Sequence, residues 1–230
     1  MYYDINNNDI ENIVSRKIKG CYSYLTGALI ITFLVSFFAY TNEAFNAVAN
    51  NLLPIALIIQ FAVPFMMAMF IYRAKPGTLL IGLLVYSAST GILLSYIAQI
   101  YTIQSVLSVL MSTICLFAVL SIYGFITRSN LMSYSGFLFV GLVSIIIMSV
   151  INIFLRSSSL DLMLSILGVI VFVIYVAYDT QLIKNKIVIL ARQGQLDLLD
   201  RVEIVGAFSL YLDFINLFIY LIRLFGRRKN

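Results

Sequence analysis

The chain has no histidine and only two cysteines among its 230 residues. Without histidine it cannot form a Ser-His-Asp or Cys-His nucleophile, a histidine-ligated haem or zinc site, or the usual switch near neutral pH. Cys21 and Cys115 lie in or beside apolar runs and lack metal-ligand spacing, so we expect no disulfide. The titrating groups of this protein should therefore be carboxylates.

Charged residues are scarce as well, at 11% of the chain against 62% hydrophobic residues, and the mean hydropathy is +1.01. Soluble domains have about 25% charged residues, so this chain cannot cover a water-facing surface. The same numbers exclude a disordered chain, a coiled coil and a collagen-like fibre. The net charge of +5 lies in short clusters between apolar runs, which favours a membrane partner over nucleic acid.

Seven apolar runs are each long enough to cross a bilayer as a helix, which takes about 20 residues. None alternates as a β-barrel strand does, so we predict an all-α polytopic membrane protein. The predicted spans are 21–41, 52–72, 78–98, 103–127, 131–155, 159–182 and 203–225. We expect one transmembrane domain over 21–226, between a polar N-terminus (1–20) and a basic tail (227–230). The expected connections are short, including Asn42–Asn51, and only Gln181–Val202 is longer.

Basic residues indicate the orientation. One set of connections contains Arg16, Lys17, Lys19, Arg73, Lys75, Arg128, Lys184, Lys186, Arg192 and Arg201, whereas the opposite loops contain only Arg156. The positive-inside rule therefore predicts a cytoplasmic N-terminus, with the first run as an uncleaved signal-anchor. The tail disagrees, because an odd number of spans places its basic residues outside: Arg223, Arg227, Arg228 and Lys229. Either the last segment spans against the rule or it is a re-entrant helix.

Two aspartates lie inside predicted spans, where a charged Asp costs about 2.5–3.5 kcal/mol at a helix centre. Asp213 belongs to a polar stripe at helical spacing, whose other members are Ser209, Asn216, Tyr220 and Arg223. Asp179 has a milder stripe, made of Tyr175, Gly168 and Ser165. Both aspartates should therefore face the protein interior.

The two aspartates would lie at the same depth, about 15 Å from the loop that joins their helices, if the sixth helix continued to about Ile189. Two carboxylates in a low-dielectric medium cannot both ionise cheaply, so they would share a proton. Such a pair can act as a proton-operated latch or an acid–base pair, or contact a divalent cation when deprotonated. Alternatively, each Asp caps a helix end or pairs with a separate basic residue, such as Lys184 for Asp179. Arg73 and Arg223 are candidate basic partners of the pair.

The two acidic segments, AYDTQLI around Asp179 and AFSLYLDFINLFIYLIRLFG around Asp213, resemble the end of the Bax inhibitor-1 (transmembrane Bax inhibitor motif) family. The length and seven-span layout resemble its prokaryotic members of the YetJ/YccA type, so the resemblance covers nearly the whole chain. The family often has a Gly-Pro signature between its third and fourth spans, of which STGILLSYIAQIYT retains only Gly91.

The resemblance implies a helical bundle with the last helix at its centre and a pH-sensitive calcium leak channel rather than an enzyme. Asp179 and Asp213 would be the diaspartyl proton sensor and gate, with transient Ca²⁺ contact, and Arg73 the latch of the closed form. Calcium would be the permeant ion, without a cofactor. The expected partners are the lipid bilayer, Ca²⁺ and protons, not nucleic acid. The Asn-, Ile- and Tyr-rich composition suggests a prokaryotic inner membrane.

Two other function classes remain open. Tyr178-Asp179 followed by a second Asp is similar to intramembrane aspartyl proteases. Those enzymes, however, have Gly-x-Gly before the second Asp, where this chain has Leu210-Tyr211-Leu212, and a Pro-Ala-Leu motif that this chain lacks. The other class is a regulator of membrane proteolysis or cell-death pathways that acts by contact, without ion flux of its own.

Overall fold

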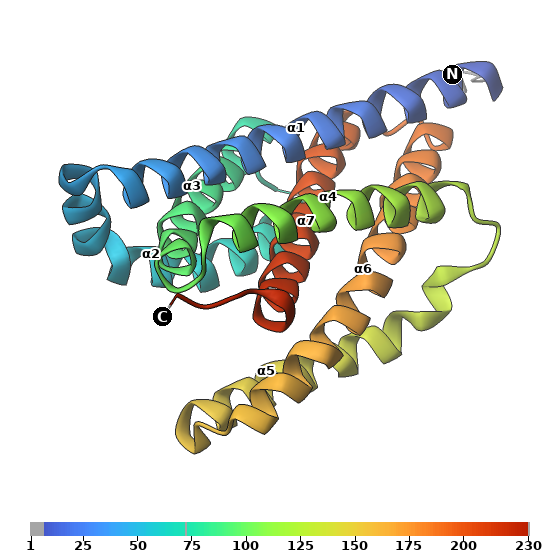
Figure 1. Ribbon diagram of the computed structural model, residues 1–230. Coiled ribbons are helices and arrows are strands. Elements are labelled where there is room, and N and C mark those ends of the chain that lie inside the picture. The colour runs from blue at the N-terminus through green and yellow to red at the C-terminus, as the bar shows by residue number, and fades with distance from the viewer. Residues whose placement is uncertain (1–6, 72, 230) are drawn as a thin grey trace. The chain divides into compact units, whose positions relative to one another are not determined.

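The computed structural model describes residues 7–71 and 73–229, and long helices dominate these residues (Figure 1). Seven of the helices are long and apolar enough to cross a membrane, which confirms the all-α prediction. In chain order the elements are α1 (Asn7–Thr41), α2 (Glu43–Phe70), α3 (Pro76–Ile100), α4 (Ile103–Ile126), the 3₁₀ turn η1 (Leu131–Tyr134), α5 (Ser135–Leu155), α6 (Ser158–Arg192) and α7 (Leu196–Phe225).

The helices extend beyond the apolar runs. The predicted connection Asn42–Asn51 is wrong, because α2 begins at Glu43. Its start is set by Asn42, whose side-chain oxygen accepts a hydrogen bond from the Phe45 amide at 3.0 Å and so caps the first turn. The polar residues that follow remain helical: the Asn46 amide group donates to the Ala39 carbonyl, and the Asn50 amide group donates to Asn46 Oδ1.

The predicted long connection Gln181–Val202 is also wrong. α6 continues to Arg192, past the Ile189 that the equal-depth hypothesis required, and α7 starts at Leu196. The three residues between them turn the chain at Gly194, whose φ of +68° lies in the left-handed region that favours glycine. Both helices therefore extend well beyond the hydrocarbon before the chain reverses.

The last helix is the most enclosed of the seven, as the sequence resemblance implied. In its most apolar stretch 72% of the residues are buried, against at most 39% in the other helices. Tyr211, Leu217 and Ile222 are completely buried along it. α7 is also one uninterrupted helix of 30 residues, about 45 Å long, which is enough to cross the bilayer without turning back. The uninterrupted length of α7 favours a spanning last helix over a re-entrant one.

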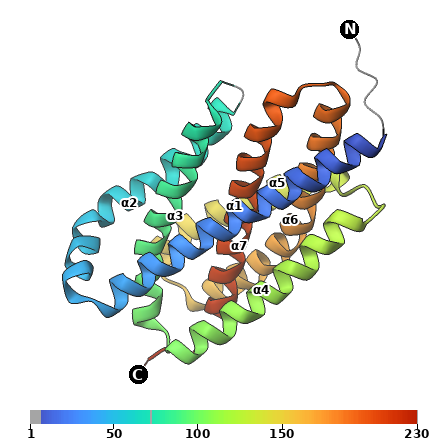
Figure 2. The same cartoon turned by 90° about the horizontal axis from the view of Figure 1, so that it is seen from above.

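The chain divides into two compact units. The first contains the described residues up to Ile100 together with Ile183–Tyr211. Here α1 runs across α3, and α2 packs on α3 (Figure 2). The helices approach closely at Gly91, where an added Cβ would lie 2.8 Å from the Thr32 carbonyl oxygen and 2.7 Å from Val35 Cβ. Gly91 therefore allows α1 and α3 to pack closely at this point.

The second unit contains the residues from Tyr101 to Leu182 and from Leu212 onward. Gly124 of α4 packs directly against the Ala177 backbone of α6, and Gly168 of α6 packs against the Tyr220 ring of α7. Beyond α7 the tail folds back onto the start of α4. The Thr102 amide donates to the Arg227 carbonyl at 2.9 Å, and Tyr101 forms an isolated antiparallel bridge with Arg228.

Candidate functional site

Asp213 is enclosed in the middle of α7. It is 4% exposed, and its Oδ2 atom has no hydrogen-bond partner among the described residues. The neighbouring Phe214 and Leu217 are buried with it, and the Phe214 ring packs edge-on against Phe117 of α4 at 5.4 Å. A buried carboxyl oxygen without a partner is costly, so this position is a strong candidate for function rather than packing.

The structure brings Asp179 to Asp213. Both residues belong to the second unit, Asp179 is half-buried on α6, and the two carboxyl groups interact electrostatically. The Tyr175 hydroxyl lies within electrostatic range of both. The Tyr175 ring contacts the rings of Phe172 and Tyr178, so a row of aromatic side chains runs along this part of α6.

The remaining members of the α7 stripe lie on either side of Asp213. Asn216 donates to the Leu212 carbonyl at 2.9 Å, and Tyr220 stacks on Phe172 at 5.8 Å. Arg223 lies 3.6 Å from an Asp161 carboxylate oxygen and 5.7 Å from the centre of the Tyr220 ring. Arg223 is therefore the partner of Asp161 at the end of the stripe. Ser209 is half-buried and belongs to the first unit.

Arg73 lies in the connection between α2 and α3. Its side chain is exposed, and its backbone amide donates to the Phe70 carbonyl at 3.0 Å. It belongs to the first unit, whereas the two aspartates belong to the second. Its role as a latch stays a prediction.

Gln181 is a site residue that the sequence reasoning missed. It follows Asp179 by two positions, and its side chain joins α6 to the connection before η1. Its Oε1 atom accepts from the Leu131 amide and its Nε2 atom donates to the Ser129 carbonyl, both at 2.8 Å. Its partners lie 50 and 52 positions away in the chain, so no sequence pattern marks it. Gln181 fixes the part of α6 that carries Asp179.

A second missed feature is a buried polar network in the first unit. The hydroxyl oxygens of Thr32 and Tyr211 lie 2.6 Å apart, and the Thr32 hydroxyl also donates to the Ser87 carbonyl at 2.9 Å. Nearby on α3, Ser89 and Thr90 accept hydrogen bonds from Gln60 of α2 at 3.0 and 3.1 Å. The network holds Tyr211, two residues before Asp213.

A third feature lies at the polar end of α1. Lys17 forms salt bridges with Asp200 at 2.5 Å and with Glu203 at 2.6 Å. Lys17 and Glu203 are mostly buried, with side chains 15% and 12% exposed, whereas Asp200 is 60% exposed. The polar start of α1 is thus tied to the start of α7.

Within residues 7–71 and 73–229, no three or more acidic, cysteine or histidine side chains gather in a way that could hold a metal ion.

The sequence model of a family described as "Inhibitor of apoptosis-promoting Bax1" (Bax1-I) matches residues 14–230. The chain belongs to the Bax inhibitor-1 family. The match includes both aspartates and all seven long helices, and it confirms the family that the acidic segments suggested.

Bacterial members of the Bax inhibitor-1 family are similar over most of their length. The inner membrane protein YbhL of Escherichia coli (strain K12) is 36% identical over 216 residues, which cover 90% of each chain. A Borreliella burgdorferi protein is 35% identical over 96% of this chain and 94% of its own. Protein RP147 of Rickettsia prowazekii is 34% identical over 97% of this chain and 94% of its own. The protein is thus an integral membrane protein of this family.

Proposed function

We propose that this Bax inhibitor-1 family protein is a pH-sensitive calcium leak channel, with Asp179 and Asp213 as its proton sensor. The observation that carries the proposal is the enclosed Asp213 carboxyl, 4% exposed with one oxygen unpartnered, within electrostatic range of Asp179. In such surroundings the proton occupancy of one carboxyl depends on the charge of the other.

At low pH the pair is protonated or shares a proton, and Arg73 acts as the latch of the closed form. As the pH rises both carboxylates ionise and repel each other. The latch then rearranges and opens a path lined by oxygen atoms, and the deprotonated carboxylates contact Ca²⁺ transiently as it moves down its gradient. Because the closed form is the protonated one, the Ca²⁺ flux should rise with pH.

The proposed location is a prokaryotic inner membrane, supported by the printed name of YbhL, an inner membrane protein. The proposed orientation has residues 1–20 in the cytoplasm, followed by one seven-helix domain over 21–226 and the basic tail 227–230. It rests on the basic residues that gather in the cytoplasmic connections, such as Arg128 and Lys184.

The test is Ca²⁺ flux into dye-loaded proteoliposomes across about pH 5 to 8. We expect flux that rises with pH in the wild type and a constant or abolished flux in Asp213→Asn. Asp161→Asn is the matched control, because Asp161 lies in the same unit but pairs with Arg223 at the helix end. It should retain the pH dependence. Absence of flux at every pH would refute the channel and favour a regulator that acts by contact.

A further inference from the structure

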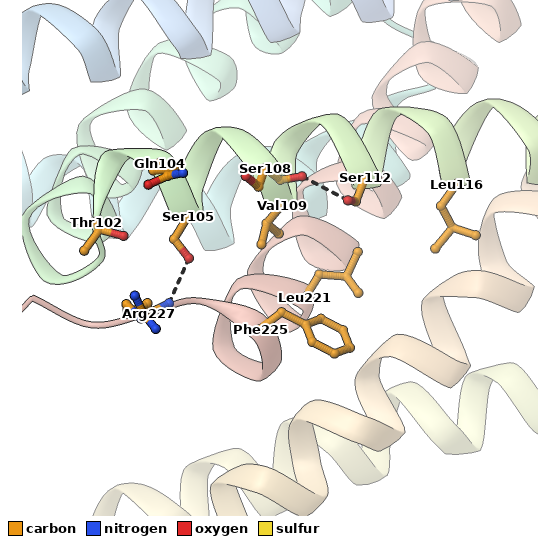
Figure 3. A pocket seen from close by; sticks show the side chains of 10 residues that line it. All are labelled: Thr102, Gln104, Ser105, Ser108, Val109, Ser112, Leu116, Leu221, Phe225 and Arg227. Carbon is orange, nitrogen blue, oxygen red and sulfur yellow. Dashed lines mark hydrogen bonds between the residues drawn. The ribbon is translucent and has the colours of Figure 1, made fainter.

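An open groove runs along α4 beside the end of α7, within the second unit (Figure 3). Its volume is about 480 Å³. This is within the range of pockets that hold small ligands. None of the residues that line it belongs to the aspartate pair or its stripe.

The two ends of the groove differ in chemistry. Arg227, Thr102 and Ser105 lie at one end, and Leu116, Leu221 and Phe225 line it further along (Figure 3). The polar end is at the start of α4 and just past the end of α7, where spanning helices reach the headgroup level. The apolar end lies deeper. Apart from Ser108 and Ser112 on α4, the lining thus changes from polar to apolar along the groove, in the order of a lipid's headgroup and acyl chain.

The tail is held over the polar end by its backbone. The Arg227 amide donates to Ser105 Oγ at 2.8 Å, and the Arg227 carbonyl accepts from the Thr102 amide at 2.9 Å. The bridge between Tyr101 and Arg228 continues this attachment. The position of Arg227 is therefore built into the fold rather than left to a loose terminus.

The Arg227 guanidinium is available for a ligand. Across residues 7–71 and 73–229 it takes part in no salt bridge, in contrast to Arg223, which pairs with Asp161. The side chain of the N-cap residue Thr102 makes no capping hydrogen bond, so the positive end of the α4 dipole adds to the charge of Arg227. The polar end of the groove is thus complementary to an anion.

We propose that this groove binds an anionic phospholipid, with the phosphate at Arg227 and an acyl chain along Leu221 and Phe225. A guanidinium presents paired N–H donors that match a phosphate. A free phosphate would leave the apolar half of the groove unfilled, whereas a phospholipid fills both halves. Phe225 is 71% exposed, so its side chain is accessible to an acyl chain.

The proposal gives a role to the residues that contradict the positive-inside rule. Arg223 is neutralised by Asp161, and Arg227 is neutralised by the lipid phosphate. It does not depend on ion conduction, because lipid binding is measured without flux.

The experiment uses the full-length protein in a zwitterionic detergent, titrated with phosphatidylglycerol and followed by native mass spectrometry. Work in about 0.5 M salt screens long-range attraction. We expect one tightly bound lipid in the wild type. Binding should be roughly tenfold weaker in Arg227→Gln, because the lipid phosphate loses a charged hydrogen-bonding partner. Arg227→Lys should weaken binding less. Arg228→Gln, one residue further on, should change it by less than about twofold.

Two further arms identify the ligand. Phe225→Ser should weaken phosphatidylglycerol binding, and inorganic phosphate at millimolar concentration should not displace the lipid. Displacement by phosphate, with no effect of Phe225→Ser, would mean a free-anion site and would overturn the lipid assignment. Equal losses in Arg227→Gln and Arg228→Gln would indicate general attraction to the tail and would overturn the site itself. Circular dichroism of each variant confirms that it is folded.

Discussion

Asp213 on α7 and Asp179 on α6 bring their carboxyl groups within electrostatic range of each other, and Asp213 is only 4% exposed. Consecutive helices joined by a turn at Gly194 create this proximity. Under the proposed function, the proton occupancy of each carboxyl depends on the charge of the other. This relationship connects the fold to the proposed gating by protons.

Removing the Tyr211 hydroxyl should loosen the polar network of the first unit. Tyr211→Phe deletes the contact with Thr32 at 2.6 Å but keeps the ring edge-on against Tyr86. We expect a loss of about 0.5–1.5 kcal/mol in the free energy of unfolding. Thermal unfolding in detergent measures it. Tyr123→Phe, at a 48% exposed ring, is the control, and an equal effect there would contradict this role of Tyr211.

Gly91 should not tolerate even a methyl group. In Gly91→Ala the new Cβ meets the Thr32 carbonyl oxygen and the Val35 side chain, so α1 and α3 must separate. We expect destabilisation by about 1–3 kcal/mol in thermal unfolding. Gly136→Ala places its methyl where nothing lies within 4 Å. It should be neutral or slightly stabilising, and similar results for both variants would refute the close contact.

Gln181 should stabilise the second unit through one buried and one partly buried hydrogen bond. Gln181→Leu leaves the Leu131 amide and the Ser129 carbonyl without this partner, at a cost of about 1–3 kcal/mol in unfolding free energy. The same change at the exposed Gln193 is the control. Hydrogen exchange should reveal faster opening around Leu131 in Gln181→Leu alone. Unchanged exchange there would show that the side chain does not hold this connection.

The two carboxylates that bind Lys17 should contribute unequally. The Glu203 side chain is 12% exposed and the Asp200 side chain is 60% exposed, so water screens the Lys17–Asp200 pair far more than the Lys17–Glu203 pair. Glu203→Gln should lower the free energy of unfolding by about 1–3 kcal/mol. Asp200→Asn should change it by less than about 1 kcal/mol. A larger effect of Asp200→Asn would contradict this order.

The number and type of helices could be predicted from the sequence because each apolar run is long enough to span a bilayer. The helix ends could not, since hydropathy detects only the part of a helix that lies in hydrocarbon. The start of α2 at Glu43 depends on one hydrogen bond that Asn42 accepts from the Phe45 amide, and the polar end of α6 continues to Arg192.

The candidate site was predictable in part. Asp179 and Asp213 are conspicuous, because a carboxylate inside an apolar run is costly. Gln181 and Gln60 acquire their importance only from partners far away in the chain, Leu131 and Thr90 among them. No pattern along the sequence contains that information.

The most direct test of the central claim is Ca²⁺ flux across about pH 5 to 8 for Asp179→Asn, Asp213→Asn and the double variant. If the two carboxyls act as one proton sensor, each single change removes the rise of flux with pH, and the double variant behaves like either single one. A rise with the wild-type midpoint in either single variant would contradict the account.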